Sequence, residues 1–243
     1  MKPIYRKTFT LSDMEVDCFG RLKLSTLLYL AQEVAGNHSE LLGAGYNTLA
    51  HKGIFWAVTR HRVQITRLPV RGETVTVETW PMPTTRVAYP RSMVAYDAQG
   101  KELFRLISLW VLMDANTRAM VLPGKSDVIV EGLLTGSELD APRSLAPRGM
   151  TDTALRTVTY SCLDRNGHMN NTKYLEWIDD LMPSDFHREH TLKEMTICYL
   201  AESWEGQQLD MYWDFPENDV MQVDFYRENG EKQERVFSAR FQY

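Results

Sequence analysis

The chain has 243 residues, a length that suits one large domain or two domains of about 100–150 residues each. Apolar residues make up 44% and charged residues 24%, so the composition is that of a globular protein rather than a disordered one. The formal net charge of −5 argues against non-specific binding to nucleic acid. The 3 cysteines show no CxxC spacing, which argues against a disulfide framework or a zinc ribbon.

Long apolar segments are missing from the sequence. No window approaches the roughly 18 apolar residues that a membrane-spanning helix needs, and the first residues lack the apolar core of a signal peptide. We therefore predict a cytoplasmic protein that binds neither a membrane nor nucleic acid and needs no metal or cofactor. A monomer and a homodimer are both compatible with this prediction.

The first half of the chain begins with a strand and a helix. Residues 5–10 alternate in polarity and predict a strand, whereas residues 23–45 place apolar side chains at helical spacing. Gly43 and Gly45 are suited to end this long helix. The pattern then changes to period two and predicts antiparallel strands at residues 55–68, 73–80, 87–96 and 101–114.

The same order of elements recurs in the second half. Residues 157–161 predict a strand and residues 172–182 a shorter helix. Further strands are predicted at residues 194–204, 207–215, 221–227 and 234–243. Matched residues keep their order in the two halves: Asp17, Gly20, Gly72 and Gly100 correspond to Asp164, Gly167, Gly206 and Gly230. We interpret this correspondence as an internal duplication.

A long helix wrapped by an antiparallel sheet is the layout of the hotdog fold. We therefore expect an α+β protein with a tandem (double) hotdog, each half burying one sheet face on its helix. Residues 1–123 would form the N-terminal hotdog and residues 151–243 the C-terminal one. Residues 124–150, which contain several prolines and glycines and few aromatic residues, would link them.

The segment DRNGHMNN, residues 164–171, is the strongest candidate for chemistry. It contains Asp164, Asn166, His168, Asn170 and Asn171 just before the second predicted helix. A histidine can transfer a proton near neutral pH, and N–H groups at a helix start can hold a developing oxyanion. Alternatively, the segment has only a structural role, in which Asn170 or Asn171 caps the helix and Asp164 makes a turn.

Comparison of the two halves favours catalysis in the second half. At the positions of Asp164, Asn166 and His168 the first half has Asp17, Phe19 and Arg21. Only the aspartate is shared, and turn formation alone does not require the asparagine and histidine.

Glu202 is the second candidate. It lies near the end of a predicted strand, where the first half has the aliphatic residue Leu68. It could be a general base or the partner of His168. A solvent-facing charge at the end of a strand is the alternative.

Several of these segments resemble the acyl-acyl-carrier-protein thioesterases of plants and bacteria. They are residues 30–43, 55–80 and 106–123, and the block D-x-N-x-H-x-N-N-x-K-Y at residues 164–174. The resemblance covers essentially the whole chain apart from the plant transit peptide. It therefore favours a bacterial cytoplasmic enzyme.

The resemblance implies hydrolysis of the thioester of a fatty acyl carrier protein, with the carrier protein as partner. It places Asp164, Asn166, His168 and Glu202 in the catalytic positions, with Asp164 either orienting the site or acting as nucleophile. Many plant members have a cysteine where this chain has Ser203, so a thiolate mechanism is not available through that residue.

The resemblance also implies substrate-binding positions. Expected contacts with the thioester are Gly167 and Asn170, and expected contacts with the acyl chain in the first half are Trp56, Met82, Met93 and Trp110. Independently of the resemblance, Arg60 and Arg62, together with Arg67 and Arg71, could form a basic patch for an acidic carrier protein, and a solvated strand edge is the alternative. An acyl-CoA thioesterase and a non-catalytic acyl-binding hotdog protein are the alternative functions.

Overall fold

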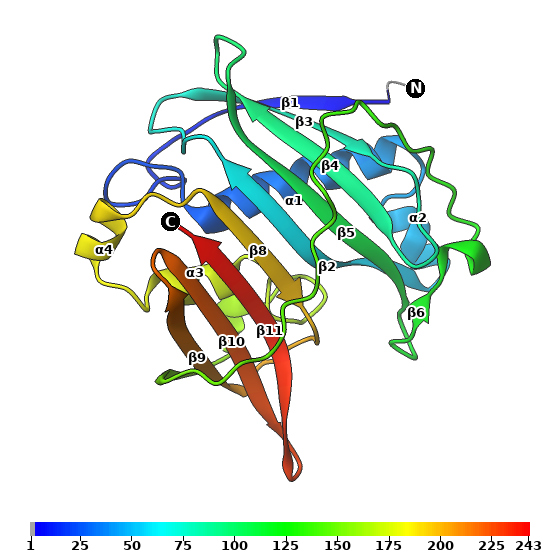
Figure 1. Ribbon diagram of the computed structural model, residues 1–243. Helices are drawn as coiled ribbons and strands as arrows, with labels where there is room; N and C mark the ends of the chain where they lie inside the picture. Colours follow the sequence, from blue (N-terminus) through cyan, green and yellow to red (C-terminus); the bar gives the residue numbers. More distant parts are fainter. Residues whose placement is uncertain (1–2) are drawn as a thin grey trace. The chain divides into compact units, whose positions relative to one another are not determined.

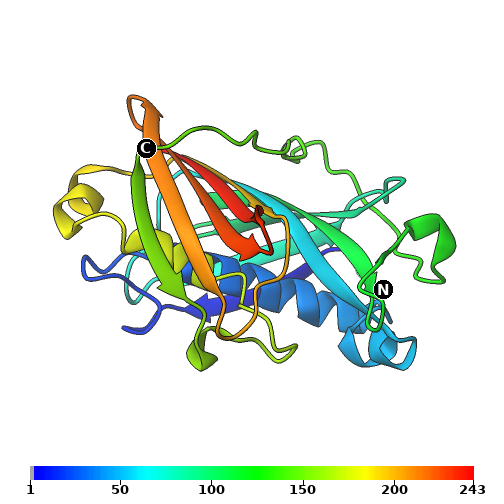
Figure 2. The same cartoon turned by 90° about the horizontal axis from the view of Figure 1, so that it is seen from below.

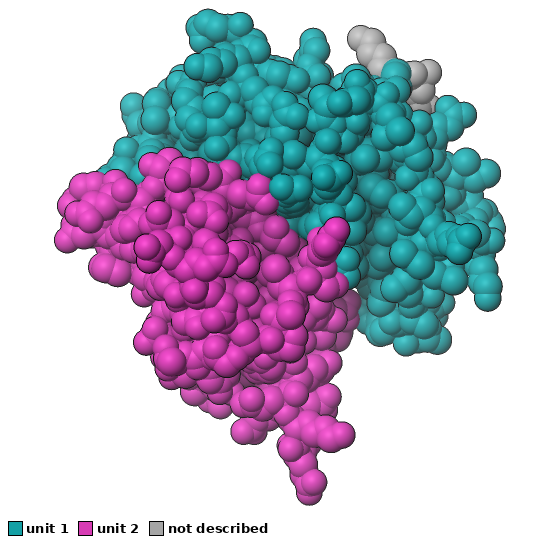
Figure 3. Space-filling view, viewed as in Figure 1, with its two compact units in different colours: residues 1–142 teal, residues 143–243 magenta. Residues whose placement is uncertain are grey.

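Figure 1 shows the computed structural model, which describes residues 3–243. The chain divides into two compact units, Met1–Pro142 and Arg143–Tyr243, which Figure 3 colours separately. The division falls inside the predicted linker, whose limits at residues 124 and 150 remain a prediction. Within residues 3–243, no helix combines the length and the apolar character needed to cross a membrane.

The first unit is a five-stranded antiparallel sheet with a long helix on one side (Figures 1 and 2). The strands of this sheet follow the order β1-β3-β4-β5-β2, and a short strand β6 pairs with β5. Its elements are β1 (Tyr5–Thr10), α1 (Leu24–Leu41), α2 (Tyr46–His51), β2 (Ile54–Ile65), β3 (Thr74–Pro81), β4 (Tyr89–Tyr96), β5 (Glu102–Asp114), β6 (Met120–Val121) and the 3-10 helix η1 (Pro123–Lys125).

Helix α1 forms because its apolar residues recur every three to four positions. Leu27, Leu28, Ala31 and Val34 are buried on one stripe. The chain leaves the helix at Gly43, whose φ of 72° lies in the left-handed region that favours glycine. This stripe packs on the sheet, so the expected long helix of the first half is confirmed.

The second unit repeats this arrangement with a shorter helix. The strands of its sheet follow the order β8-β11-β10-β9-β7. Its elements are β7 (Asp152–Thr157), the 3-10 helix η2 (Tyr160–Cys162), α3 (Lys173–Asp179), α4 (Ser184–Glu189), β8 (Glu194–Tyr199), β9 (Gln208–Glu217), β10 (Val220–Asn229) and β11 (Lys232–Gln242).

Aromatic side chains join α3 to its sheet. The Tyr174 ring stacks on Phe237 of β11 at 4.5 Å between centroids, and Trp177 stacks on Phe225 of β10 at 6.3 Å. Phe225 and Phe237 are fully buried. Helix α3 has only 7 residues, and Pro183, which cannot continue a helix, lies between it and α4.

The tandem hotdog predicted from the sequence is confirmed, but local predictions differ in places. The strand predicted at residues 157–161 is wrong, because the strand ends at Thr157 and residues 160–162 form a 3-10 turn. The strand predicted at residues 194–204 ends at Tyr199, so Glu202 lies in the following loop. Helices α2 and α4 are short, each with 6 residues, and their sequences show too few turns for a helical period to emerge.

Buried tyrosines make the second unit sensitive to alkaline pH. Burial raises the pKa of Tyr174 to about 12 and raises the pKa of Tyr199 well above its usual range. The folded protein therefore holds these protons more tightly than the unfolded chain does. Their contribution to the free energy of unfolding is complete below about pH 10 and is lost as the pH rises toward the folded pKa.

We predict that Tyr174→Phe makes the free energy of unfolding less dependent on pH between about pH 10 and 12. Removing one titrating group should reduce the slope by up to about 1.4 kcal/mol per pH unit. Urea unfolding of both proteins at pH 8, 10 and 11 measures this slope. Equal slopes in the two proteins would contradict the assignment.

Candidate functional site

Residues 163–169 of the second unit form a loop that is closed by its own backbone. Leu163 and Met169 make an isolated antiparallel bridge, and the Asp164 N–H donates to the His168 carbonyl at 2.8 Å. The Gly167 N–H donates to the Asp164 carbonyl at 3.0 Å, and Gly167 has a φ of 82°. The shape of the loop is therefore set independently of any ligand.

The first unit contains the same loop. Val16 and Leu22 form the corresponding bridge, and the Asp17 N–H donates to the Arg21 carbonyl at 2.7 Å. Gly20 takes the place of Gly167, with a φ of 75°. The predicted duplication therefore extends to individual hydrogen bonds, and the two loops can be compared atom by atom.

The shared aspartate organises the backbone in both loops. Asp164 Oδ1 accepts the N–H groups of Asn166 at 2.7 Å and His168 at 3.3 Å. Asp17 Oδ1 accepts the N–H groups of Phe19 and Arg21, each at 2.9 Å. The carboxylate thus has the same structural contacts in a loop with a histidine and in a loop without one.

The second carboxylate oxygen marks the difference between the loops. In the first unit Asp17 Oδ2 accepts both Nε of Arg21 at 3.0 Å and its Nη2 at 2.9 Å. In the second unit Asp164 Oδ2 lies 3.4 Å from the side-chain amide nitrogen of Asn166. The ion pair of the first unit is replaced by a weak amide contact, and Asn166 stays exposed.

His168 lies between two residues of the loop that follows β8. Its Nδ1 is 3.4 Å from Oε1 of Glu202, and its side chain is only 8% exposed. The Trp204 ring meets the imidazole edge to face at 4.1 Å between centroids, and the backbones of these two residues form a bridge. The Glu202 side chain is 31% exposed, so solvent can reach the carboxylate beside a buried imidazole.

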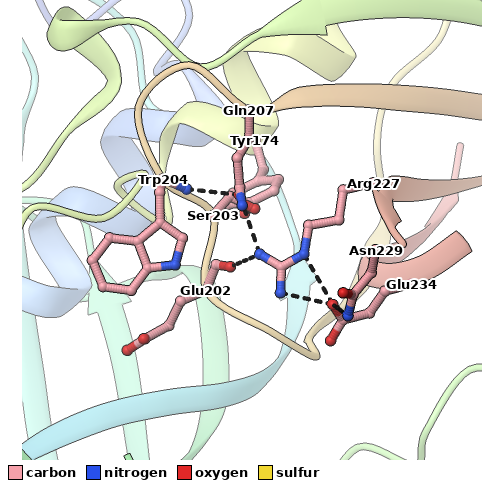
Figure 4. A network of polar contacts seen from close by, with 8 residues as sticks. All are labelled: Tyr174, Glu202, Ser203, Trp204, Gln207, Arg227, Asn229 and Glu234. Carbon is pink, nitrogen blue, oxygen red and sulfur yellow. Dashed lines mark hydrogen bonds and ion pairs between the residues drawn. The ribbon is translucent and has the colours of Figure 1, made fainter. Parts of the chain in front are cut away.

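Ser203 faces the helix of its unit. It is 1% exposed, and its hydroxyl accepts a hydrogen bond from the Tyr174 hydroxyl at 2.9 Å (Figure 4). Tyr174 belongs to α3. Ser203 therefore contacts the core, whereas its neighbour Glu202 approaches His168.

The backbone donors of residues 167–170 are already engaged. The Gly167 and His168 N–H groups donate to Asp164, the Met169 N–H to the Ser203 carbonyl, and the Asn170 N–H to the Cys162 carbonyl. These residues precede the first helical residue, Lys173. The geometry therefore does not support the expectation that Gly167 and Asn170 bind the thioester through free N–H groups at a helix start.

Asn170 has the capping contacts of the structural alternative. Its side-chain oxygen accepts both the N–H and the hydroxyl of Thr172, each at 2.9 Å. Among the N–H groups of residues 166–171, that of Asn171 is the one without an acceptor in the described part of the chain. The Asn171 N–H is therefore a candidate donor for a ligand.

The expected acyl-chain residues lie in the first unit. Trp56 and Trp110 pack against an apolar cluster of Ala44, Leu49, Tyr89, Leu112 and Val128. Their indole N–H groups donate to the Ala44 carbonyl and the Ser108 hydroxyl, each at 2.8 Å. Met93 of β4 is 1% exposed, and Met82 follows β3 with its N–H bound to the Pro90 carbonyl at 2.9 Å.

Arg60 and Arg62 occupy one face of β2. They alternate with His61 and Val63, which are buried in the first unit, so both arginines point to the opposite face of the sheet. Nη1 of Arg60 lies 3.4 Å from the Pro142 carbonyl. The two arginines therefore lie on the face of their sheet that is opposite to the helix.

In the second unit the structure brings together Asp164, Asn166, His168 and Glu202.

Trp204 was not predicted to belong to the site. The duplication contained a usable signal, because the equivalent residue in the first unit is Val70, which makes the same backbone bridge to Arg21. In the second unit the corresponding bridge joins Trp204 to His168.

Known families match both halves of the chain. The sequence model of the acyl-ACP thioesterase N-terminal domain matches residues 2–125, and that of the C-terminal domain matches residues 149–242. A chloroplast palmitoyl-acyl carrier protein thioesterase of Arabidopsis thaliana is 29% identical over 217 residues, covering 82% of this chain and 52% of the relative. A dodecanoyl-[acyl-carrier-protein] hydrolase of Cinnamomum camphora is 27% identical over 217 residues, covering 82% and 56%. The chain spans about half the length of these curated relatives.

Solved structures match along nearly the entire chain. An acyl-ACP thioesterase from Bacteroides thetaiotaomicron superposes with a TM-score of 0.87 and 26% identity, covering 99% of this chain and 97% of that one. A 12:0-ACP thioesterase from Umbellularia californica gives a TM-score of 0.83 at 22% identity, covering 100% and 97%, and supports the fold alone.

The role of Asp164 in shaping the loop leads to a stability prediction. Asp164→Ala removes the acceptor of two N–H groups and should lower the free energy of unfolding by about 1–2 kcal/mol. Asp164→Asn keeps an acceptor oxygen and should lower it much less. Asp17→Ala, the matched change in the first unit, should lower it at least as much, because Asp17 also pairs with Arg21. Equal stabilities of the two Asp164 variants in urea would argue against this role.

Proposed function

Because the chain belongs to the acyl-ACP thioesterase family, we propose that it hydrolyses the thioester of a fatty acyl carrier protein, releasing a free fatty acid and the carrier protein. The observation that supports this most is the approach of Glu202 Oε1 to Nδ1 of His168 at 3.4 Å. The first unit has Leu68 and Arg21 at these positions and cannot form such a pair. Catalysis is therefore assigned to the second unit.

In the proposed reaction the His168–Glu202 pair activates a water molecule. The pair accepts a proton from water, the hydroxide adds to the thioester carbonyl carbon, and the carbon–sulfur bond breaks. The proton then passes to the departing thiolate, so that acid and thiol are formed without a further reactant. A thiolate is a good leaving group because the pKa of a thiol is only about 8.5.

Asp164 is proposed to orient the loop rather than to attack the substrate. Both of its oxygens already accept hydrogen bonds, and Asp17 has the same backbone contacts in the unit that lacks the histidine. Donors for the developing oxyanion would be the exposed side-chain amide of Asn166 and the N–H of Asn171. Gly167 and Asn170 then serve the shape of the loop.

The remaining parts of the proposal concern the acyl chain and the carrier. The acyl chain is proposed to bind on the helix side of the first sheet, where Trp56, Met93 and Trp110 lie. Arg60 and Arg62, on the opposite face of β2, would attract the acidic carrier protein. A cytoplasmic location, where acyl carrier proteins and their products are accessible, is part of the same proposal.

Thiol release from acyl carrier proteins of increasing chain length tests the function, with the matched acyl-CoA as comparison. We expect release of the carrier thiol and a higher kcat/KM for the carrier substrate than for the CoA substrate. His168→Ala and Glu202→Gln should each lower kcat by at least ~10²-fold, the usual scale for acid–base groups. Ser203→Ala should change kcat far less, because its hydroxyl binds Tyr174.

Other outcomes of this assay favour the alternatives. A clear preference for acyl-CoA would identify an acyl-CoA thioesterase. Binding of acyl substrates without thiol release would identify a non-catalytic acyl-binding protein. Loss of turnover in Asp164→Asn, with the free energy of unfolding retained, would restore Asp164 as the nucleophile.

Charge reversal tests the carrier contact. Arg60→Glu or Arg62→Glu should raise the KM for an acyl carrier protein more at low salt than at high salt, because salt screens the attraction between charges of two proteins over a Debye length of about 10 Å at 0.1 M. An acyl thioester of N-acetylcysteamine, a small uncharged substrate, provides the control and should keep its KM. A salt response like that of the unmodified protein would remove these arginines from the carrier contact.

A further inference from the structure

The loop between β8 and β9 carries two side chains to His168. Glu202 supplies the carboxylate at 3.4 Å, and Trp204 supplies the ring at 4.1 Å between centroids. Both residues lie outside regular secondary structure, so the strand ladder does not hold them. The backbone bridge between His168 and Trp204 and the bond from the Met169 N–H to the Ser203 carbonyl hold the loop on one side. A second interaction holds it at the backbone of Glu202.

Arg227 of β10 makes that interaction from the opposite side of the loop (Figure 4). Its Nη1 donates to the main-chain carbonyl of Glu202 at 2.5 Å and to Oε1 of Gln207 at 3.1 Å. The same Gln207 oxygen accepts the main-chain N–H of Trp204 at 3.0 Å. One guanidinium thus binds the backbone at Glu202 directly and the backbone at Trp204 through one side chain.

The guanidinium itself is fixed by the β10–β11 hairpin. Its Nε and Nη2 donate to Oε2 of Glu234 at 2.9 and 2.8 Å, and Asn229 donates to the same oxygen at 3.1 Å. Arg227 and Glu234 are direct cross-strand partners. The Arg227 side chain is 16% exposed, so solvent competes little for these bonds.

The first unit holds the equivalent loop with a similar set of contacts, but different residues supply them. There the Val70 N–H donates to Oε2 of Glu73 at 3.0 Å, as the Trp204 N–H does to Gln207. The cation is Arg67, a residue of the loop itself, which binds Glu73 at 2.8 Å and Asp97 at 3.4 Å.

The positions of cation and partner are exchanged between the units. By the matched glycines, Arg67 corresponds to Ala201, Glu73 to Gln207, and Asp97 to Arg227. In the first unit the arginine belongs to the loop and binds Asp97 beside the sheet. In the second unit the arginine belongs to the sheet and binds the loop. The second arrangement places a donor on the carbonyl of the residue that carries the carboxylate.

We propose that Arg227 is a positioning residue for the His168–Glu202 pair. The Glu202 carboxylate and the Trp204 ring extend from the side of the loop that faces away from the guanidinium (Figure 4). Arg227 acts by holding the backbone from which both groups project. The expected effect on kcat rests on the proposed function. The expected effect on the position of the His168–Glu202 pair does not.

The test compares Arg227→Met, which keeps much of the apolar stem, with Arg227→Lys. With an acyl carrier substrate, Arg227→Met should lower kcat by roughly 10- to 100-fold, the scale for misplacing a catalytic group by about 1 Å. KM should change little, and the acidic limb of the pH–rate profile should move. Arg227→Lys, which retains one donor toward the loop, should recover part of kcat.

The matched control is Arg67→Met in the first unit. It removes the contacts of Arg67 with Glu73 and Asp97, so it should lower the Tm to a similar extent. The pH–rate profile should stay unchanged. If Arg227→Met is folded and keeps the kcat and pH profile of the unmodified protein, the inference is overturned. If Arg227→Met does not fold, a kcat and pH profile in Arg227→Lys equal to those of the unmodified protein overturn it instead.

A readout without turnover separates this inference from the proposed function. The imidazole resonances of His168 can be titrated by NMR in the unmodified protein and in Arg227→Met or Arg227→Lys. A displaced titration midpoint supports the positioning role, and an unchanged midpoint in a folded variant refutes it. If the unmodified protein releases no thiol, the proposed function fails, whereas the NMR titration still decides the role of Arg227.

Discussion

The hydrogen bonds that the Asp164 carboxylate accepts from its own loop are the constraint on which the site depends. They fix the backbone on either side of Gly167, and through that backbone they fix His168. A carboxylate is a strong acceptor, and two N–H groups converging on one oxygen leave the loop few alternative shapes. His168 can therefore be nearly buried and still meet a residue that follows another strand.

The duplicated chain uses this one loop for two purposes. In the first unit the place of the histidine is taken by Arg21, which pairs with the organising aspartate and closes the loop upon itself. In the second unit no such ion pair exists, and the loop presents an exposed amide and an imidazole. The two units thus share the hydrogen bonds that shape the loop, and they differ in the side chains that the loop carries.

Much of the fold could be predicted from the sequence because period-two and helical patterns survive in single segments. The buried stripe of α1 and the strands of both sheets other than β6 and β7 follow directly from spacing. The end of β7 at Thr157 could not be read in this way, because residues 158–162 retain strand-like residues while their backbone turns into η2.

The sequence predicted which residues to consider for the site, and these remain a prediction, but it did not predict their contacts. The comparison of Asp17 with Asp164 identified the loop, but the engagement of the N–H groups at residues 167–170 depends on carbonyls of Cys162 and Ser203, which the sequence pattern does not place. The contacts of Arg227 with the loop after β8 were missed for a similar reason. An arginine in a polar strand end resembles a solvated charge until its cross-strand partner Glu234 and its loop acceptor are known.

The burial of Ser203 against Tyr174 has a consequence for the conditions under which the protein can work. A cysteine at this position would place an oxidisable thiol next to Glu202 in the chain. Here the hydroxyl is inert to peroxides and to alkylating reagents. Of the cysteines, Cys162 and Cys198 are buried and the exposed Cys18 lies in the first unit. The proposed chemistry is therefore insulated from the redox state of its surroundings.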